Sequence, residues 1–458
     1  MIPQTLTTLA EWAGGVLAQG SPHTAITQVG TDTRAIVPGS LFVALAGERF
    51  DAHDFVIQAA EAGAAAVLVS RAVSVPESCG VILVPDTLAA LQMMAATYRR
   101  EWGGLVLGLT GSNGKTSTKD LTNAVLSRTF KVCATKGNLN NHIGLPLTVL
   151  SANAADKLGV WEMGMNHPGE IEPLADIAGP DAAIITNVGT AHLEFMGTRE
   201  AIALEKGMLA EAVHPDGCVI LNANDDFTPD IALRCQATVL TAGVGQGDIR
   251  AEQVESSVAG CAFILHLPDG TSGPVLLPVP GRHMAGNAAL AAAAGWHFGL
   301  RLEEITAGLQ SAVLTKGRLQ MRRAAGLTFI DDTYNANPDS MRAALETLLG
   351  FACTGRRIAV LGRMGEIGAT SRQEHLALGA SANRPGIDFL CVVGGGDAEL
   401  ISQGFLESGG DPARHAAFTG QAECAAWLRA SATPADLILV KGSRSAAMEK
   451  VIETAAAV

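Results

Sequence analysis

The stretch with the clearest chemical signature joins an apolar run to a glycine-rich turn and a Lys-Thr pair. Residues 105–118 read LVLGLTGSNGKTST. Gly111 and Gly114 let backbone N–H groups curve around an anion, and a helix starting near Lys115 adds the positive end of its dipole. In such a loop the lysine reaches the β- and γ-phosphates and the Thr116 hydroxyl binds Mg²⁺. The spacing therefore predicts a strand, a phosphate-binding loop and a helix.

This loop is a short form of the phosphate pattern. The longer form, G-x-x-x-x-G-K-[ST], is not met, because Leu109 stands where its first glycine is expected. The alternative is a glycine turn with an exposed lysine. The apolar run before the loop and the amphipathic positions Leu121, Ala124 and Val125 after it favour the phosphate loop.

Four further polar residues of the same region are candidates for a ligand site. Glu162 lies within an apolar strand, where an unpaired carboxylate is costly, so we expect a metal or a lysine as its partner. His192 follows a buried strand, and Lys206 lies in a helical stretch; alone, they are an ordinary loop histidine and a solvated helix residue. Asn287, near the start of an Ala-rich helix, either binds a ligand or caps and packs the helix.

Other polar segments have two interpretations each. Asp32-Thr33-Arg34 forms either a local turn with an ion pair or a clamp for a sugar or diphosphate. Residues 441–444, Lys-Gly-Ser-Arg, end the last predicted strand and either face an anion or cap the sheet. The glycines of 362–368 do not fit G-x-G-x-x-G, and we interpret them as a tight strand-to-helix turn rather than a dinucleotide site.

The elements that position these residues indicate an α/β protein of three domains. We expect a small α/β domain over 1–100, a central ATP-binding domain with a mostly parallel sheet over 101–315, and a Rossmann-like domain over 316–458. Ligands of parallel sheets lie at the carboxyl ends of the strands, where the candidate residues fall. The predicted central strands are 105–109, 159–163, 182–187, 217–221 and 238–241, with a β excursion over 250–280.

Composition excludes several classes of protein. Lys and Arg number 32 against 45 Asp and Glu, a net charge of −13 without a basic run, so nucleic acid is not an expected partner. The eight cysteines are scattered without metal-site spacing and are expected to be reduced thiols. Because no apolar run approaches membrane-spanning length and no signal peptide is recognisable, we expect a cytoplasmic protein without a membrane span. We also expect a monomer.

Together these segments resemble the Mur ligase family over nearly the whole chain. Two of them, Lys-Gly-Asn-Leu-Asn-Asn from 136 and Asp-Thr-Tyr-Asn-Ala-Asn-Pro to 338, resemble the member that adds the last unit of the peptide; the Asp-Asn-Pro-Arg string of the diaminopimelate-adding member is absent. One position departs from the family, since Ala52 replaces an expected glycine. The segments carrying the resemblance are 110–117, 136–144, 162–164, 186–192, 205–207, 283–287, 331–338 and 441–444.

The resemblance implies a role for each candidate. Asp32, Thr33 and Arg34 would hold the UDP part of a substrate. Thr116 and Glu162 would hold one Mg²⁺, and His192 with a carbamylated Lys206 a second, because carbamylation turns the lysine into a carboxylate-like ligand. The implied ATP contacts are Gly111, Ser112, Asn113, Gly114, Lys115, Thr116, Ser117, Asn287, Arg318, Asp332 and Tyr334. Asn141 would contact a substrate, and Asn335 and Asn337 would contact the dipeptide or the product.

The implied reaction is ATP-dependent amide formation between UDP-N-acetylmuramoyl-tripeptide and D-alanyl-D-alanine through an acyl phosphate. Lys115, His192, Lys206 and Arg318 would be its catalytic residues, neutralising charge on the transferring phosphoryl group directly or through Mg²⁺. The alternatives are a different amino-acid ligase of the family or a folylpolyglutamate synthase-like enzyme. A nucleotide-dependent switch or kinase is a further alternative from another class.

Overall fold

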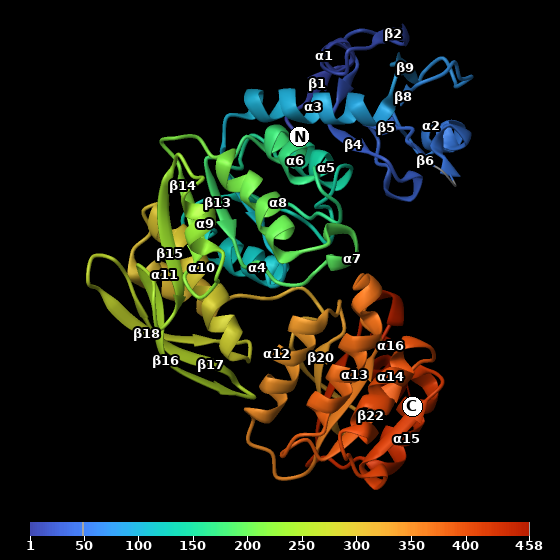
Figure 1. The fold of residues 1–458 in the computed structure, drawn as a ribbon. Coiled ribbons are helices and arrows are strands. Elements are labelled where there is room, and N and C mark those ends of the chain that lie inside the picture. Colours follow the sequence, from blue (N-terminus) through green and yellow to red (C-terminus); the bar gives the residue numbers. More distant parts are fainter. Residues whose placement is uncertain (48–49, 458) are drawn as a thin grey trace.

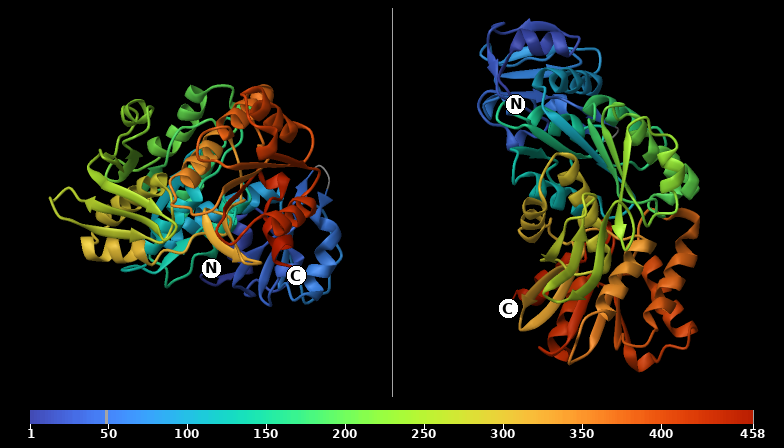
Figure 2. Two further views of the ribbon diagram at one scale, coloured as in Figure 1. Left: turned by 90° about the horizontal axis from the view of Figure 1, so that it is seen from below. Right: turned by 90° about the vertical axis from the view of Figure 1, so that its left-hand side faces the viewer.

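The molecule consists of three α/β units in a row. The computed structural model describes residues 1–47 and 50–457, and within them the strands form sheets of five, nine and six strands. The five-stranded unit lies at one end of the molecule and the six-stranded unit at the other (Figures 1 and 2). The predicted α/β class is therefore confirmed. Within the described residues, no helix combines the length and apolarity needed to cross a membrane.

The first unit has strand order β2-β9-β8-β5-β4, with β2 antiparallel to β9 and the other pairs parallel. Its sheet strands are β2 (Val16–Gln19), β4 (Gln28–Gly30), β5 (Ser40–Val43), β8 (Ala66–Val69) and β9 (Gly80–Leu83). Its short paired strands are β1 (Gln4–Thr5) with β3 (Ala25–Ile26), and β6 (Ala46–Gly47) with β7 (Phe50–Asp51). Its helices are α1 (Leu6–Trp12), α2 (Val56–Glu61) and α3 (Thr87–Trp102).

The second unit has strand order β11-β12-β10-β13-β14-β15-β16-β17-β18, parallel as far as β16 and antiparallel beyond it. Its strands are β10 (Leu105–Thr110), β11 (Val132–Ala134), β12 (Leu158–Glu162), β13 (Ala182–Ile185), β14 (Cys218–Asn222), β15 (Thr238–Val244), β16 (Ile249–Ser257), β17 (Gly260–His266) and β18 (Ser272–Leu277). Its helices are α4 (Lys115–Leu126), α5 (Gly144–Ser151), α6 (Ile171–Ala178), α7 (Leu193–Met196), α8 (Arg199–Glu211), α9 (Thr228–Ala232), α10 (Arg282–His297) and α11 (Leu302–Gln310).

The order of the central strands explains where a ligand would bind. After β10 the chain moves to β11 and β12 on one side, and then crosses to β13 on the other side. Such a reversal opens a crevice at the carboxyl ends of the strands. Helix α10, which is alanine at most positions from 288 to 294, is fully buried there; its small side chains let it pack closely against α4. The predicted phosphate-binding loop, which follows β10, therefore starts at the crevice.

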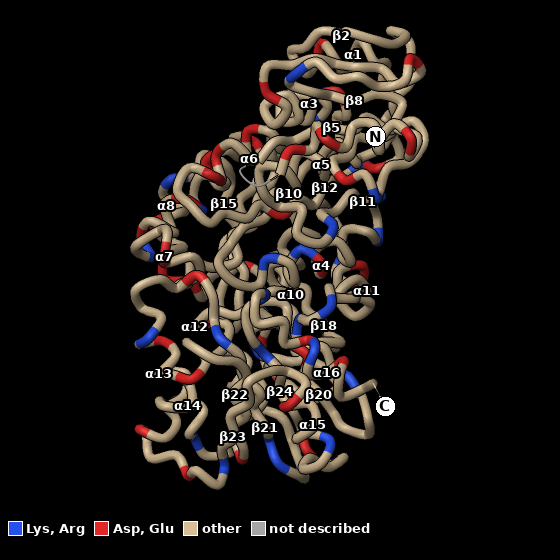
Figure 3. Tube along the Cα trace, turned by 90° about the vertical axis from the view of Figure 1, so that its right-hand side faces the viewer, with Lys and Arg blue, Asp and Glu red and all other residues tan. Residues whose placement is uncertain are grey.

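The third unit has strand order β19-β20-β24-β21-β22-β23, in which only the β19–β20 pair is antiparallel among the described strands. Its strands are β19 (Gln320–Ala324), β20 (Leu327–Asp332), β21 (Arg357–Gly362), β22 (Phe389–Val393), β23 (His415–Phe418) and β24 (Leu437–Lys441). Its helices are α12 (Pro338–Leu349), α13 (Ser371–Ala382), α14 (Asp397–Glu407), α15 (Gln421–Ser431) and α16 (Glu449–Ala456). Acidic and basic positions are interspersed along all three units (Figure 3).

Candidate functional site

The phosphate-loop candidate leaves β10 at the crevice, and the end of β13 holds it in place. The Ser112 and Asn113 amides donate to the backbone and side-chain oxygens of Asn187, at 2.9 and 2.8 Å. The Thr186 hydroxyl donates to the Asn113 carbonyl at 2.6 Å. Gly111 approaches this strand so closely that a Cβ would lie 1.8 Å from Thr186 Oγ1, which is why glycine is required there. The loop is thus rigid before any ligand binds.

Lys115 folds back over this loop. Its ammonium donates to the Gly111 carbonyl at 2.7 Å and lies 3.3 Å from the Ser112 carbonyl. Burial lowers the Lys115 pKa, while the charge of Glu162 opposes that shift. The buried Ser112 hydroxyl makes no hydrogen bond with any described residue. The loop therefore presents a cation and a free hydroxyl group to an incoming phosphate.

Glu162 ends β12 beside the loop and is 2% exposed. Its Oε1 accepts a hydrogen bond from Asn140 Nδ2 at 2.8 Å, and the Thr116 hydroxyl lies 3.5 Å away. Its Oε2 is buried without a partner among the described residues. A buried carboxylate oxygen in this state is costly, and of the two partners expected from the sequence, a metal or a lysine, no described lysine pairs with Glu162. The free oxygen and the Thr116 hydroxyl are hard donors that fit Mg²⁺.

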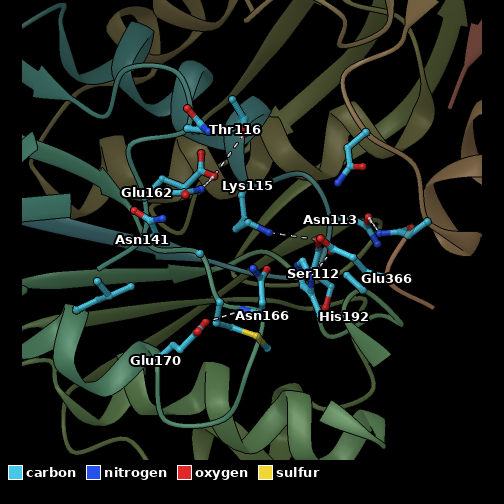
Figure 4. Close-up of a pocket in the computed structure, with 18 of the residues that line it drawn as sticks. Ser112, Asn113, Lys115, Thr116, Asn141, Glu162, Asn166, Glu170, His192 and Glu366 are labelled. Atoms are coloured by element: carbon cyan, nitrogen blue, oxygen red, sulfur yellow. Dashed lines mark hydrogen bonds and ion pairs between the residues drawn. The ribbon is translucent and has the colours of Figure 1, made fainter. Parts of the chain in front are cut away.

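His192 follows β13 on the loop before α7, as expected from the sequence. Its Nδ1 lies 2.6 Å from Oε2 of Glu366, which comes from the third unit. Both residues have a left-handed backbone, with φ of 62° and 58°. Burial lowers the His192 pKa, and the Glu366 carboxylate partly opposes this. In Figure 4, Thr116, Glu162 and Asn141 lie on one side of Lys115, and Ser112, Asn113, His192 and Glu366 lie on the other.

Lys206 lies in α8 and is 1% exposed, so the alternative of a solvated helix residue is wrong. Burial lowers its pKa well below the usual lysine value, and the charge of Lys115 lowers it further. The neighbouring Glu205 carboxylate accepts three backbone hydrogen bonds at the start of α6, at 2.7 to 2.9 Å. Lys206 does not line the cavity at the phosphate loop, although its charge affects His192.

Several candidates from the second and third units face one another across a cavity of about 600 Å³. Arg318 lies over the Tyr334 ring at 4.1 Å, and its Nη2 is 3.3 Å from the Thr116 hydroxyl. Asn337 Nδ2 donates to Asn113 Oδ1 at 2.7 Å. The sequence-predicted residues lining the cavity are Ser112, Asn113, Gly114, Lys115, Thr116, Asn141, Glu162, His192, Arg318, Tyr334, Asn335 and Asn337.

A second cavity of about 200 Å³ adjoins the first, and Asn113, Gly114 and Arg318 line both. Asn287 and Asp332 line the second cavity. Asn287 does not cap α10; its amide packs against Gly114, where a Cβ would lie 2.9 Å from Oδ1. Asp332 is already paired with Lys441 at 2.6 Å and accepts from the Leu319 amide at 3.3 Å. Asp332 therefore lines this cavity with its carboxylate paired to Lys441, and its contact with a nucleotide stays a prediction.

The Asp32 segment lies apart from these cavities, in the first unit. Asp32 pairs with Arg34 at 2.8 Å, and this hydrogen-bonded contact lowers the Asp32 pKa to about 2. The turn interpretation therefore holds, yet Asp32, Thr33 and Arg34 also line a pocket of about 560 Å³. The rings of Phe50 and Phe55 stack at 5.1 Å beside it. Ala52 lies in a 3-10 helix over 52–55, a backbone open to alanine.

Sequence reasoning missed several residues that complete these sites. Asn140 holds Glu162, and Asp225 and Arg199 hold the Val188 amide and carbonyl at 2.7 and 2.8 Å. Glu366 contacts His192 from a glycine-rich turn that had been interpreted only as a turn. The signal available for Glu366 was a charged side chain within that turn, and for Asn140 it was the segment 136–144 that carries the family resemblance; Asp225 and Arg199 carry no distinctive spacing.

A phosphate-loop candidate lies at a sheet reversal and faces a Rossmann-like unit across a polar cavity. These features are typical of multidomain nucleotide-dependent α/β enzymes. Three family models cover the chain: "Mur ligase family, catalytic domain" over 25–99, "Mur ligase middle domain" over 109–295 and "Mur ligase, glutamate ligase domain" over 317–444. The chain belongs to the Mur ligase family.

Named relatives agree with this assignment. The UDP-N-acetylmuramoyl-tripeptide–D-alanyl-D-alanine ligases of Bacillus subtilis and Escherichia coli are 39% and 38% identical, each over 99% of this chain and 98% of the relative. A crystal structure of MurF from Acinetobacter baumannii superimposes with a TM-score of 0.90 at 36% identity, covering 100% of this chain and 99% of that one. MurF of Thermotoga maritima in complex with ADP has a TM-score of 0.82 at 28% identity, covering 94% and 97%.

Proposed function

We propose that this protein joins D-alanyl-D-alanine to UDP-N-acetylmuramoyl-tripeptide with hydrolysis of ATP to ADP and phosphate, giving the UDP-linked pentapeptide used in peptidoglycan synthesis. The observation that carries the proposal is the full-length similarity to ligases of this name, 39% identical over 99% of the chain. The site has the groups that the chemistry needs. A carboxylate is a poor electrophile, so it must first be phosphorylated and then attacked by an amine.

In this proposal the second unit, residues 101–315, binds ATP. The phosphate loop and Lys115 hold the phosphates, and Asn287 lies at the nucleotide cavity with Ser117. Thr116 and Glu162 would hold Mg²⁺, which supplies charge neutralisation at the transferring phosphoryl group when bound. Arg318 reaches the same place from the third unit, where its guanidinium can neutralise the developing charge.

Lys206 is proposed to carry a carbamate and, with His192, to hold a second Mg²⁺. Carbamylation joins an uncharged amine nitrogen to carbon dioxide with loss of one proton, so it needs an amine that is neutral near pH 7. Burial of Lys206 provides this state by lowering its pKa. The product is an anion, which the charge of Lys115 would stabilise.

The outer units are proposed to hold the substrates. The pocket of residues 31–34 in the first unit, residues 1–100, would bind the UDP part, with Arg34 facing the diphosphate and the stacked Phe50 and Phe55 flanking it. In the third unit, residues 316–458, Asn335 and Asn337 would contact the dipeptide or the product. Because the proposed reaction consumes ATP and a UDP-linked substrate, and all eight cysteines are free thiols, we place the reaction in the cytoplasm.

The experiment that tests the function is ADP release with mass spectrometry of the product. We expect ADP only when ATP, UDP-N-acetylmuramoyl-tripeptide and D-alanyl-D-alanine are all present, together with a product that has gained the dipeptide minus one water. ADP release without the peptides would favour a switch or kinase. Product formed with glutamate or a single amino acid in place of the dipeptide would favour a different ligase of the family.

A further inference from the structure

The turn between β21 and α13 is built to hold one carboxylate in the large cavity. The His375 imidazole accepts from the Met364 amide at 2.9 Å, and the Ser443 amide donates to the Arg363 carbonyl at 2.9 Å. Met364 is 2% exposed and anchors the turn in the core of its unit. Gly368 packs against the second unit so closely that a Cβ would lie 2.9 Å from Glu194 Cα.

Glu366 stands at the tip of this anchored turn. Its φ of 58° is unusual for a residue with a side chain and costs about 1–2 kcal/mol. Its side chain is 47% exposed, and its carboxylate lies 2.6 Å from Nδ1 of the His192 ring. Because the fold holds a long charged residue in a strained position where glycine would be easier, the carboxylate itself has a use.

Each of the other carboxylates around the cavity has a different role. Of the described residues that line it, those with carboxylates are Glu162, Glu170 and Glu366. Glu162 faces the phosphate loop and fits a metal ion. Glu170 accepts hydrogen bonds from the amides of residues 166 and 167, at 2.7 and 3.2 Å, and closes a turn. Among the described residues that the third unit contributes to the cavity wall, Glu366 is the one that carries a carboxylate.

The second substrate needs an anionic partner at this wall. Under the proposed function, on which this inference rests, the incoming dipeptide carries an ammonium at the end that becomes the nucleophile. A cation that leaves water for a polar cavity is unstable unless a carboxylate pairs with it. We propose that Glu366 binds the α-ammonium of D-alanyl-D-alanine and so positions the amine beside His192 and the phosphate loop.

In the substrate-free structure His192 occupies the place of the ammonium. Both side chains lie on the same side of Lys115 as Asn113 (Figure 4). When an ammonium binds Glu366, it replaces His192 Nδ1 as the partner of the carboxylate, so the carboxylate stays paired. The wall would thus select an amine nucleophile over a neutral hydroxyl of the same size, because only the amine carries the charge that Glu366 needs.

A pair of ligands separates this role from a structural one. Binding of D-alanyl-D-alanine and of D-lactyl-D-alanine, which has a hydroxyl in place of the amine, is measured by calorimetry with a non-hydrolysable ATP analogue, Mg²⁺ and UDP-N-acetylmuramoyl-tripeptide. In Glu366→Gln we expect the affinity for the amine ligand to fall roughly 10- to 100-fold, while that for the hydroxyl ligand changes less than about threefold. Glu366→Asp should keep part of the preference.

The matched control is Glu346→Gln, which removes an exposed carboxylate of the same unit that pairs with Arg384 at 2.6 Å. It should leave both affinities unchanged. If Glu366→Gln unfolds, Glu366→Gly removes the same charge while relieving the backbone strain, and the same comparison applies. Equal losses for both ligands, no loss for either, or a raised Mg²⁺ requirement with both ligands would overturn the proposal. Wild-type protein that forms no pentapeptide product would instead refute the proposed function.

Discussion

At the scale of single residues, the candidate site contains buried ionisable groups that are unstable without a ligand. Glu162 has a buried oxygen without a described partner, and Lys206 is a buried amine whose pKa is lowered by burial. Groups of this kind lower the stability of the empty protein and gain from ligand binding. Such a compromise is typical of a functional site, and each of the two residues gives a prediction.

Removal of the Glu162 charge should maintain or raise the stability of the metal-free protein while it reduces the stability gained from metal binding. Glu162→Gln keeps the oxygen that accepts from Asn140 but no longer buries an anion. We expect the metal-free variant to be as stable as wild type or up to about 2 kcal/mol more stable. Urea denaturation in EDTA, repeated with Mg²⁺ and an ATP analogue, checks this. Wild type should gain stability from the ligands; an equal gain in the variant would contradict a metal role.

For Lys206, the carbamate predicts chemical rescue. Lys206→Ala removes the amine and leaves space near His192, so we expect ligase activity to fall at least roughly a hundredfold, the scale of losing a group that stabilises transition-state charge. Formate or acetate should restore part of it by supplying the missing carboxylate. Lys450→Ala, at an exposed position of α16, controls for effects of the acids on the assay. Unchanged rates in Lys206→Ala would remove this residue from the metal site.

At the scale of elements, His375 couples a helix to the turn that carries Glu366. Its Nδ1 donates to the Ser371 carbonyl at 2.8 Å while Nε2 accepts from the Met364 amide, so only the neutral ring satisfies both contacts. Burial lowers the His375 pKa below its usual value. The unfolded chain therefore binds more protons than the folded chain just below pH 6.5, and stability falls as the pH drops through this range.

Replacement of His375 should reduce this pH dependence. We expect His375→Gln to be less stable at pH 7.5, because one contact is lost, but to lose less stability than wild type between pH 7 and pH 5. The difference between the two slopes should approach about 1.4 kcal/mol per pH unit, the value for one proton. Urea unfolding at several pH values measures both slopes. Parallel slopes would show that His375 does not exchange a proton on unfolding.

Much of the element layout was predictable from the sequence because each central strand is an apolar run that ends in polar residues. The expected strand 105–109 is β10 (Leu105–Thr110), and the β excursion over 250–280 is the antiparallel edge of β16 to β18. Short edge strands such as β11 were missed, since three residues give no periodic pattern. The burial of Lys206 was also missed, because it depends on how α8 packs rather than on its own sequence.

At the scale of the whole molecule, the contacts that the sequence could not predict are those that cross between units. Glu366 meets His192 and Asn337 meets Asn113 over separations in sequence that no local pattern reports. The resemblance to the family implied Arg318, Asp332 and Tyr334 of the third unit as nucleotide contacts, whereas the contacts of Glu366 with His192 and of Asn337 with Asn113 are found in the structure alone. The site is therefore a property of the arrangement of units, and its assembly can be measured.

Substitution of Asp339 can test how the units assemble. At the start of α12, its Oδ2 accepts hydrogen bonds from the Thr190 amide and hydroxyl at 2.8 and 2.9 Å, joining the third unit to the loop that carries His192. We expect the protein in solution to become more compact with an ATP analogue and the nucleotide substrate, because closure excludes water from the acyl phosphate. Asp339→Ala should weaken this compaction.

Small-angle scattering with and without these ligands measures the radius of gyration directly. Thr190→Val is the matched variant, since it removes only the hydroxyl contact and should have a smaller effect than Asp339→Ala. Both variants should raise the KM for the dipeptide more than they change ATP binding. The candidate phosphate loop lies wholly in the second unit, whereas Glu366, the proposed partner of the dipeptide, lies in the third. An unchanged radius of gyration on ligand binding in wild type would show that the units are already assembled and that Asp339 stabilises a fixed interface.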